Sequence, residues 1–463
     1  MAKATAPKAT RKAGPRQGNR SPAPRRQGAD TRKRTPARPI NRLGFAAVVL
    51  IATLFLLGNA VAYQSQFDPI DVFEYQCYAH GFWQGTGVTD LANGHSCAPI
   101  WGGLPHQFRS FPSEYPAAAL TLFSLPLLTP WWPYQTAYGL WLALFVLVVV
   151  GVLAWRGPPE AAIAFPLYTL VAGWGFLVQR YDLLVGVCIL LMVLLARRDR
   201  WRAATVLLAV GTLLKIVPIV LLPLLLIASR AGPQKRPRLD LLGIFAGVCL
   251  VVLLPTLILN PDQALGPLRF LTTRPLQLES LPGMLLWLTG GIANADNGNG
   301  PLGGAHIALS YNSLNVIGGA SAFWSALSLA LGGAGLLAAY WRVWRGRDSL
   351  GRGAILVLLI LLGAGKTASP QYILWLLPTV AVVEGIRLRW IAVAALVWAI
   401  MNGYYTVALT ALPWTPTFAG TILLRNALLC GVALAYLLTP GDLIASGWPT
   451  TPLWRRVSTL VRR

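Results

Sequence analysis

Long apolar runs recur along almost the whole chain and constrain its fold more than any other feature. Each run of roughly 17–25 residues is long enough for a helix to cross a hydrocarbon layer about 30 Å thick. Charged residues make up only 12% of the chain, about half their share in soluble proteins. Because backbone polar groups in lipid must be satisfied internally, we expect an all-α fold, a polytopic bundle of transmembrane helices.

The N-terminal segment carries much of the net charge of +23. Residues 1–42 contain thirteen Lys and Arg residues but one acid, Asp30. With few apolar residues to bury, this segment is typical of disorder. We expect a cytoplasmic tail that contacts anionic lipid. The sequence disfavours a nucleic-acid partner, because no aromatic side chain is interleaved among the basic residues to stack on bases.

The remaining basic clusters predict the topology, because cytoplasmic loops of membrane proteins are enriched in Lys and Arg. If every cluster faces the cytoplasm, the apolar segments between them cross in pairs. We expect about 12 crossings in a membrane domain of residues 43–440, with both termini cytoplasmic and a basic tail at 441–463. The clusters are Arg156, Arg197–Arg202, Arg230–Arg238, Arg342–Arg352, Arg387 with Arg389, and Arg455–Arg463.

Two apolar segments cannot each be a single membrane crossing in this topology. Residues 203–227 lie between two basic clusters and contain Pro218, so we expect a hairpin of two short helices whose tip, near Lys215, faces outward. Residues 115–128 would invert everything downstream if they spanned, so we expect a short helix in the outer leaflet.

This topology places two long loops outside, residues 64–114 and 260–320, each carrying short helices. Loops of this length are usually functional or disordered. The first contains Cys77 and Cys97, which can form a disulfide in an oxidising compartment.

The acids Asp68, Asp71 and Glu74 crowd the exit of the first apolar run, although the chain has only 16 acidic residues. Asp68 precedes Pro69 and is typical of a turn, whereas Asp71 and Tyr75 are spaced to share a helical face. Charged groups at membrane depth are costly and usually mark a functional site. Other outward ends carry further charges, namely Arg180, Asp182, Lys215, Arg269, Arg274, Glu279 and Lys366.

Acids and bases on one face of a membrane suit an anionic lipid-phosphate substrate. Arg and Lys neutralise a phosphate, and a carboxylate can take a proton from an attacking hydroxyl. Sugar transfer from a lipid-linked phosphate to an alcohol requires both a cation for the phosphate and a base for the hydroxyl proton. The sequence contains no Walker loop, HExxH or CxxC motif, and its four histidines lack metal-ligand spacing. We therefore expect no metal and no tightly bound cofactor.

Six motifs follow one another along the chain: DVFEY, FPSEYP, RYDLL, LLKIVPIVLLP, RPLQLES and SPQYILWLLP. Together they resemble the C-type integral-membrane glycosyltransferases, and more closely family 87, which includes mycobacterial mannosyltransferases acting on phosphatidylinositol mannosides. The similarity covers about residues 44–440. Two departures are Ala117 after Tyr115–Pro116 and the absence of histidines near SPQY.

The resemblance implies a polyprenyl-phosphate-sugar donor, a lipid or glycan acceptor and an inverting displacement. It implies Asp71 as catalytic base, with Tyr75 completing its motif, and Tyr115, Gln371 and Tyr372 among the substrate-binding residues. It also implies a hexose, with mannose the first candidate, and a place in the bacterial plasma membrane with an extracytoplasmic active site that builds the cell envelope.

Two other functions are compatible with the residues. A multi-pass transporter or flippase of lipid-linked sugar would also place charges among helices, although such proteins usually show repeated halves with broken helices. The sequence shows one broken hairpin. If the protein were instead a structural partner of envelope enzymes, Asp71 could be replaced without loss of function.

The topology predicts that residues in both long loops are accessible from outside. A membrane-impermeant thiol reagent should label Thr86→Cys and Asn297→Cys variants in intact cells without permeabilisation. Protection of both positions from the reagent would overturn the topology.

Overall fold

The computed structural model describes residues 42–66, 70–85, 96–101, 110–156, 158–173, 176–230, 238–288, 305–310, 313–410 and 416–439. The predicted basic tails lie almost entirely outside these ranges. So do Asp68, the labelling positions Thr86 and Asn297, and parts of both predicted outer loops.

Five described helices are long and apolar enough to cross a membrane. They are α1 (Arg42–Gln66), α5 (Tyr134–Arg156), α10 (Leu239–Leu259), α14 (Ser321–Trp344) and α18 (Pro416–Leu438). Further apolar helices lie among them: α6 (Pro159–Gly173), α7 (Asp182–Ala196), α8 (Trp201–Leu214), α9 (Leu222–Ala228), α15 (Leu350–Ala364), α16 (Leu377–Glu384) and α17 (Leu388–Thr410). The helical bundle agrees with the expected membrane architecture, while the number of about 12 crossings stays a prediction.

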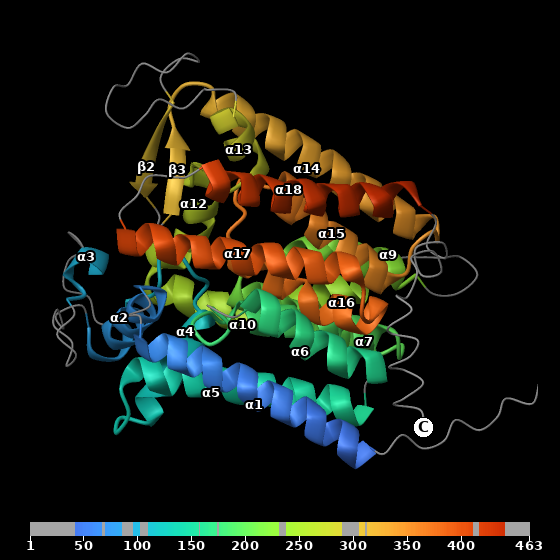
Figure 1. Ribbon diagram of the computed structural model, residues 1–463, viewed down its shortest axis with the longest axis horizontal. Coiled ribbons are helices and arrows are strands. Elements are labelled where there is room, and N and C mark those ends of the chain that lie inside the picture. The colour runs from blue at the N-terminus through green and yellow to red at the C-terminus, as the bar shows by residue number, and fades with distance from the viewer. Residues whose placement is uncertain are drawn as a thin grey trace, which may run out of the picture.

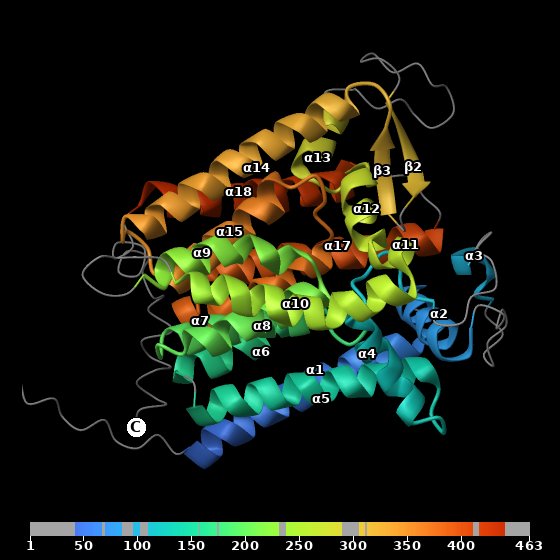
Figure 2. The same ribbon diagram turned by 180° about the vertical axis from the view of Figure 1, so that it is seen from behind.

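The long helices lie roughly side by side along the longer dimension of the molecule (Figures 1 and 2). One end, which we call the α2 end, carries α2 (Ile70–Gln84), α3 (Ala98–Trp101) and a small sheet (Figure 1). The opposite end carries the start of α1 and the last turn of α14. Long apolar helices therefore connect the α2 end of the molecule to the opposite end.

The predicted hairpin around Lys215 is present. α8 ends at Leu214, Lys215 is extended, and the chain returns through the 3-10 helix η2 (Val217–Leu221) into α9. Pro218 lies in η2, where its missing N–H does not interrupt an α-helix. The turn places the Lys215 side chain at the junction of two helices.

Residues 115–128 form α4 (Ala119–Ser124) and the 3-10 helix η1 (Leu125–Leu128). Together they are about 17 Å long, well short of a hydrocarbon layer about 30 Å thick. The expectation of a short helix rather than a crossing agrees with this geometry.

The α2 end departs from the all-α expectation. Three antiparallel strands form a sheet in the order β1-β3-β2, with Leu276 paired to Val316. The strands are β1 (Leu276–Gln277), β2 (His306–Ser310) and β3 (Ser313–Ile317). The rule that excludes open strands applies to backbone exposed to lipid, and these strands pair with one another instead. The same part of the chain holds the expected short helices, α11 (Pro261–Ala264), α12 (Gly266–Thr273) and α13 (Leu281–Leu288).

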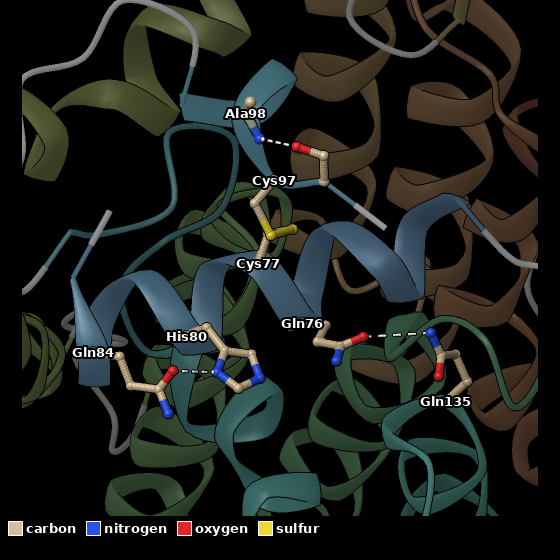
Figure 3. The surroundings of a disulfide bond; sticks show 8 residues. Gln76, Cys77, His80, Gln84, Cys97, Ala98 and Gln135 are labelled. Atoms are coloured by element: carbon tan, nitrogen blue, oxygen red, sulfur yellow. Dashed lines mark hydrogen bonds between the residues drawn. A yellow bond between two sulfur atoms is a disulfide. The ribbon is translucent and has the colours of Figure 1, made fainter. Parts of the chain in front are cut away.

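A disulfide holds α2 at this end (Figure 3). Cys77 of α2 is bonded to Cys97, the pair considered from the sequence, across 20 residues. Gln135 at the start of α5 donates to Gln76 of α2 at 3.4 Å. Further along, the Gln263 side chain hydrogen-bonds to Ser110. The two outer segments are therefore tied to the bundle and to each other.

A close contact between α7 and the 3-10 helix η3 (Pro370–Trp375) sets their relative position. A Cβ atom added to Gly186 would lie 2.2 Å from the carbonyl oxygen of Leu374. Only glycine permits this approach. The contact brings Trp375 to the start of α7, where the site described below is found.

The opposite end contains a buried ion cluster. Asp348 is paired with Arg342 at 2.6 Å and with Arg352 at 2.7 Å, and all three side chains are buried. Arg342 also donates to the carbonyl oxygens of Leu437 and Thr439. The cluster therefore joins the end of α14, the start of α15 and the end of α18.

We expect Asp348→Asn to destabilise the protein by about 3–5 kcal/mol, because it leaves two buried guanidinium groups without their carboxylate. The measurement is the midpoint of thermal unfolding in detergent. Asp240→Asn is the matched control, since Asp240 forms exposed pairs with Arg202 and Arg238; its midpoint should hardly change. Equal midpoints for the two variants would contradict the role of the cluster.

Candidate active site

Acidic and basic side chains from separate parts of the chain meet at the α2 end. Asp71 lies in the first turn of α2 and forms an ion pair with Arg180, which precedes α7. The two side chains are 18% and 24% exposed, so the pair is shielded but reachable. Arg180 fixes the orientation of the Asp71 carboxylate. The sequence named both residues, and the structure brings them into contact.

A second, deeper ion pair lies beside the first. The Lys215 ammonium is 2.6 Å from Asp182, whose side chain is 1% exposed, and Trp375 donates its indole N–H to the same carboxylate oxygen at 2.6 Å. The ammonium also lies 4.9 Å from the ring of Tyr372 and 5.6 Å from that of Tyr181, within the range of cation–π attraction. Asp182 is thus enclosed, and Lys215 is held between a carboxylate and aromatic rings.

Tyr75 belongs to the packing beneath the site. Its ring is buried, stacks on Phe123 at 4.3 Å and meets Tyr115 and Tyr181 edge-on. The sequence placed Tyr75 and Asp71 on one helical face. In the structure, Asp71 pairs with Arg180 at the partly exposed edge, while Tyr75 anchors α2 against α4. Edge-on and stacked aromatic pairs favour such anchoring.

Two further carboxyl groups face this cluster. Glu74 is 7% exposed; burial, then Glu114 and Asp71, raise its pKa to about 8. Burial also raises the pKa of Glu114 to about 7. The positive charge of Arg274 opposes this rise, and the negative charge of Asp71 adds to it. Near neutral pH, Glu74 is therefore mainly protonated, and Glu114 lies close to its midpoint. Burial and the neighbouring negative charges together raise the pKa of both carboxyl groups.

Glu114 was not among the residues that the sequence nominated. The sequence did contain an indication: Glu114 is the acid of FPSEYP in a predicted outer loop, and the chain has only 16 acidic residues. The sequence did not show that this loop would turn back onto Asp71 and Arg274.

Arg274 follows α12 and reaches the site from the other outer segment. Its guanidinium donates to Ser313 at 2.9 Å and to the Tyr372 hydroxyl at 3.4 Å, while its buried Nε has no hydrogen-bond partner. Lys366 donates to the carbonyl oxygen of Arg274 at 2.8 Å and to that of Thr272. Lys366 therefore satisfies carbonyl groups at the end of α12, and Arg274 is turned toward the cluster.

Other nominated residues lie in different surroundings. Arg269 forms an exposed pair with Asp262. Glu279 is buried and accepts from Gln277, and its backbone carbonyl accepts from Arg425 and Asn426 of α18. Gln371 is also buried. Arg425 and Asn426, which the sequence did not nominate, belong with Glu279 to a network that fixes β1 against α18.

The arrangement combines an accessible carboxylate with cations that can receive an anion. Asp71 can accept a proton, and Lys215 and Arg274 can compensate a phosphate. Within the described ranges, no group of three or more His, Cys, Asp or Glu side chains is placed to hold a metal ion.

Comparison with known proteins identifies the family. Residues 114–370 match the family model described as glycosyltransferase family 87. No match was found among curated proteins or solved structures. The matched stretch begins at Glu114 and includes Arg180, Lys215 and Arg274, whereas Asp71 precedes it. Since it covers more than half of a chain built around membrane-length helices, the protein belongs to glycosyltransferase family 87 and is a membrane glycosyltransferase.

Proposed function

We propose that this protein transfers a hexose from a polyprenyl-phosphate-linked donor to a lipid or glycan acceptor at the outer face of the bacterial plasma membrane, with Asp71 as general base. Mannose is the first sugar to test. The observation that carries the proposal is the Asp71–Arg180 pair beside Lys215 and Arg274, at the end of a helix of membrane length.

The donor class follows from the position and sign of the charges. A lipid-linked sugar keeps its tail in the bilayer and presents its phosphate at the membrane surface. Lys215 and Arg274 are cations of the cluster at the α2 end, and Arg274 has a buried N–H without a hydrogen-bond partner. Arg provides directional donors for phosphate oxygens, and Lys provides a compact charge. We assign both to the donor phosphate, and Asp182 to holding Lys215 in place.

In the proposed reaction, the acceptor oxygen attacks the anomeric carbon as the bond from that carbon to the phosphate oxygen breaks. Asp71 takes the acceptor proton, and the electron pair of the broken bond leaves with the phosphate. Charge therefore grows on the phosphate oxygen, where Lys215 and Arg274 stabilise it. The product has inverted configuration, because one displacement occurs.

Glu74 is the rival base, and its surroundings disfavour it. Glu74 is 7% exposed, so an acceptor hydroxyl has little access to it. Its raised pKa of about 8 keeps it mainly protonated at neutral pH, and a protonated carboxyl cannot accept the proton. Asp71 is both more exposed and oriented by Arg180.

The extracytoplasmic assignment rests on the distribution of basic residues. Arg202, Arg238 and the Arg342–Asp348–Arg352 cluster lie at helix ends opposite those that form the site. Cytoplasmic faces are enriched in such residues, so the α2 end is assigned to the outer face.

Asp71→Asn should reduce product formation by about 10²–10⁴-fold, the usual loss when a positioned base is removed. The assay is product analysis of membranes given labelled polyprenyl-phosphate-mannose. Glu74→Gln is the comparison and should retain much more activity than Asp71→Asn.

Near-normal turnover by Asp71→Asn would exclude Asp71 as the base, and loss of activity only in Glu74→Gln would transfer the role to Glu74. Movement of the labelled lipid across the membrane without a glycosylated product would favour the flippase alternative.

Lys215→Met should raise the KM for the donor by about tenfold or more, because a charge-assisted contact to phosphate is lost. Lys215→Arg keeps the charge and should restore most of the affinity. Arg202→Met is the control and should leave KM unchanged, because Arg202 is exposed at the start of α8, the helix that ends just before Lys215. An unchanged KM in folded Lys215→Met protein would remove Lys215 from the donor site.

A further inference from the structure

The charged groups around Glu114 balance one another when the site is empty. Asp71 is paired with Arg180, and Asp182 is paired with Lys215. This leaves Arg274 as the cation that acts most strongly on Glu114. Among these described groups, three cations thus face three acids when Glu114 is ionised and Glu74 is protonated. A site without net positive charge is poorly suited to an anion.

Arg274 and Glu114 attract each other without touching. Within the described part of the chain, no salt bridge at or below 4.0 Å joins them to each other or to another residue. The Nε of Arg274 is buried without a hydrogen-bond partner. An unsatisfied buried donor costs free energy, so the Arg274 guanidinium gains stability from any oxygen partner that its Nε acquires.

We propose that Glu114 is the internal counter-ion of the donor-phosphate site and takes up a proton when the phosphate binds to Arg274. The proposal rests on the proposed function, because it assumes a phosphate-linked donor. It assigns to Glu114 a positioning role in charge balance that is separate from the proton removal assigned to Asp71.

The charge count supports this exchange. A sugar phosphodiester carries one negative charge. With Glu114 ionised, binding would leave one uncompensated negative charge in a shielded site. With Glu114 protonated, the three cations exceed the two remaining carboxylates by one, and the phosphodiester neutralises that charge. The proton comes from water, and no bond of the donor changes in this step.

The surroundings of Glu114 determine the direction of the pH dependence. The groups that act on or are influenced by it are Asp71, Glu74 and Tyr78 from α2, Tyr115 from its own segment, and Arg180, Tyr181, Lys215 and Arg274 from elsewhere. Its pKa of about 7 means that the carboxyl is neutral below this pH and ionised above it. Phosphodiester binding is therefore strongest below pH 7 and weakens as the pH rises through about 7.

The test measures binding rather than turnover. The probe is the methyl phosphodiester of farnesol, whose charge is constant between about pH 6 and 9, with full-length protein in detergent micelles. The Kd of the unaltered protein should rise by about fivefold or more between pH 6 and 8, as expected for one nearby charge. Glu114→Gln should show a smaller rise in Kd, because only Glu74, whose pKa is about 8, still ionises over this range, and it should bind about fivefold more tightly than the unaltered protein at pH 8.

Asp240→Asn is the matched control, because it removes one acid at the opposite end and should behave like the unaltered protein. Weaker or unchanged binding by Glu114→Gln at pH 8 would overturn the counter-ion role while leaving the donor class intact. Failure of every variant to bind the probe would overturn the phosphate-linked donor and the inference with it.

Discussion

The contact of Lys215 with Asp182 organises the site, because it compensates two charges in a place that water hardly reaches. Asp182 is 1% exposed and accepts hydrogen bonds from both Lys215 and Trp375. These residues come from the start of α7, the turn after α8, and η3. Removing either charged partner would leave an uncompensated charge, which is far more costly than an exposed one. The pair therefore fixes three chain segments, and the neighbouring Tyr181 hydroxyl adds a bond to the carbonyl of Leu214.

The two ends of the bundle use similar ion pairs for different purposes. At the opposite end, Asp348 is fully enclosed by Arg342 and Arg352, and this cluster joins helix ends. At the α2 end, Asp71 remains partly exposed, and Arg274 keeps an unsatisfied N–H. A carboxylate enclosed by two guanidinium groups gives a structural joint, whereas a partly exposed carboxylate remains accessible to a ligand. This difference, together with the family membership, directs attention to the α2 end as the place of sugar transfer.

Sequence reasoning was most successful where a physical rule acts on a short stretch. The Lys215 hairpin followed from Pro218 between two basic clusters, and the short helix within residues 115–128 followed from the topology, which a crossing there would have inverted. The family resemblance was confirmed by the match over residues 114–370. The rule for lipid-exposed backbone did not extend to β1, β2 and β3, whose backbone groups pair with one another. Glu114 was missed because its importance depends on Arg274, 160 positions away in the printed numbering.

The sequence by itself determined the helical membrane architecture, the family and the side chains able to hold a phosphate or take a proton, because apolar length and local motifs are properties of contiguous residues. Only the tertiary structure decided how those side chains are used. It paired Asp71 with Arg180, enclosed Asp182 and Glu279, directed Lys366 to backbone carbonyls and placed Glu114 opposite Arg274. Burial and distance between remote segments set these roles, because the strength of a charge depends on how much water and which partners surround it.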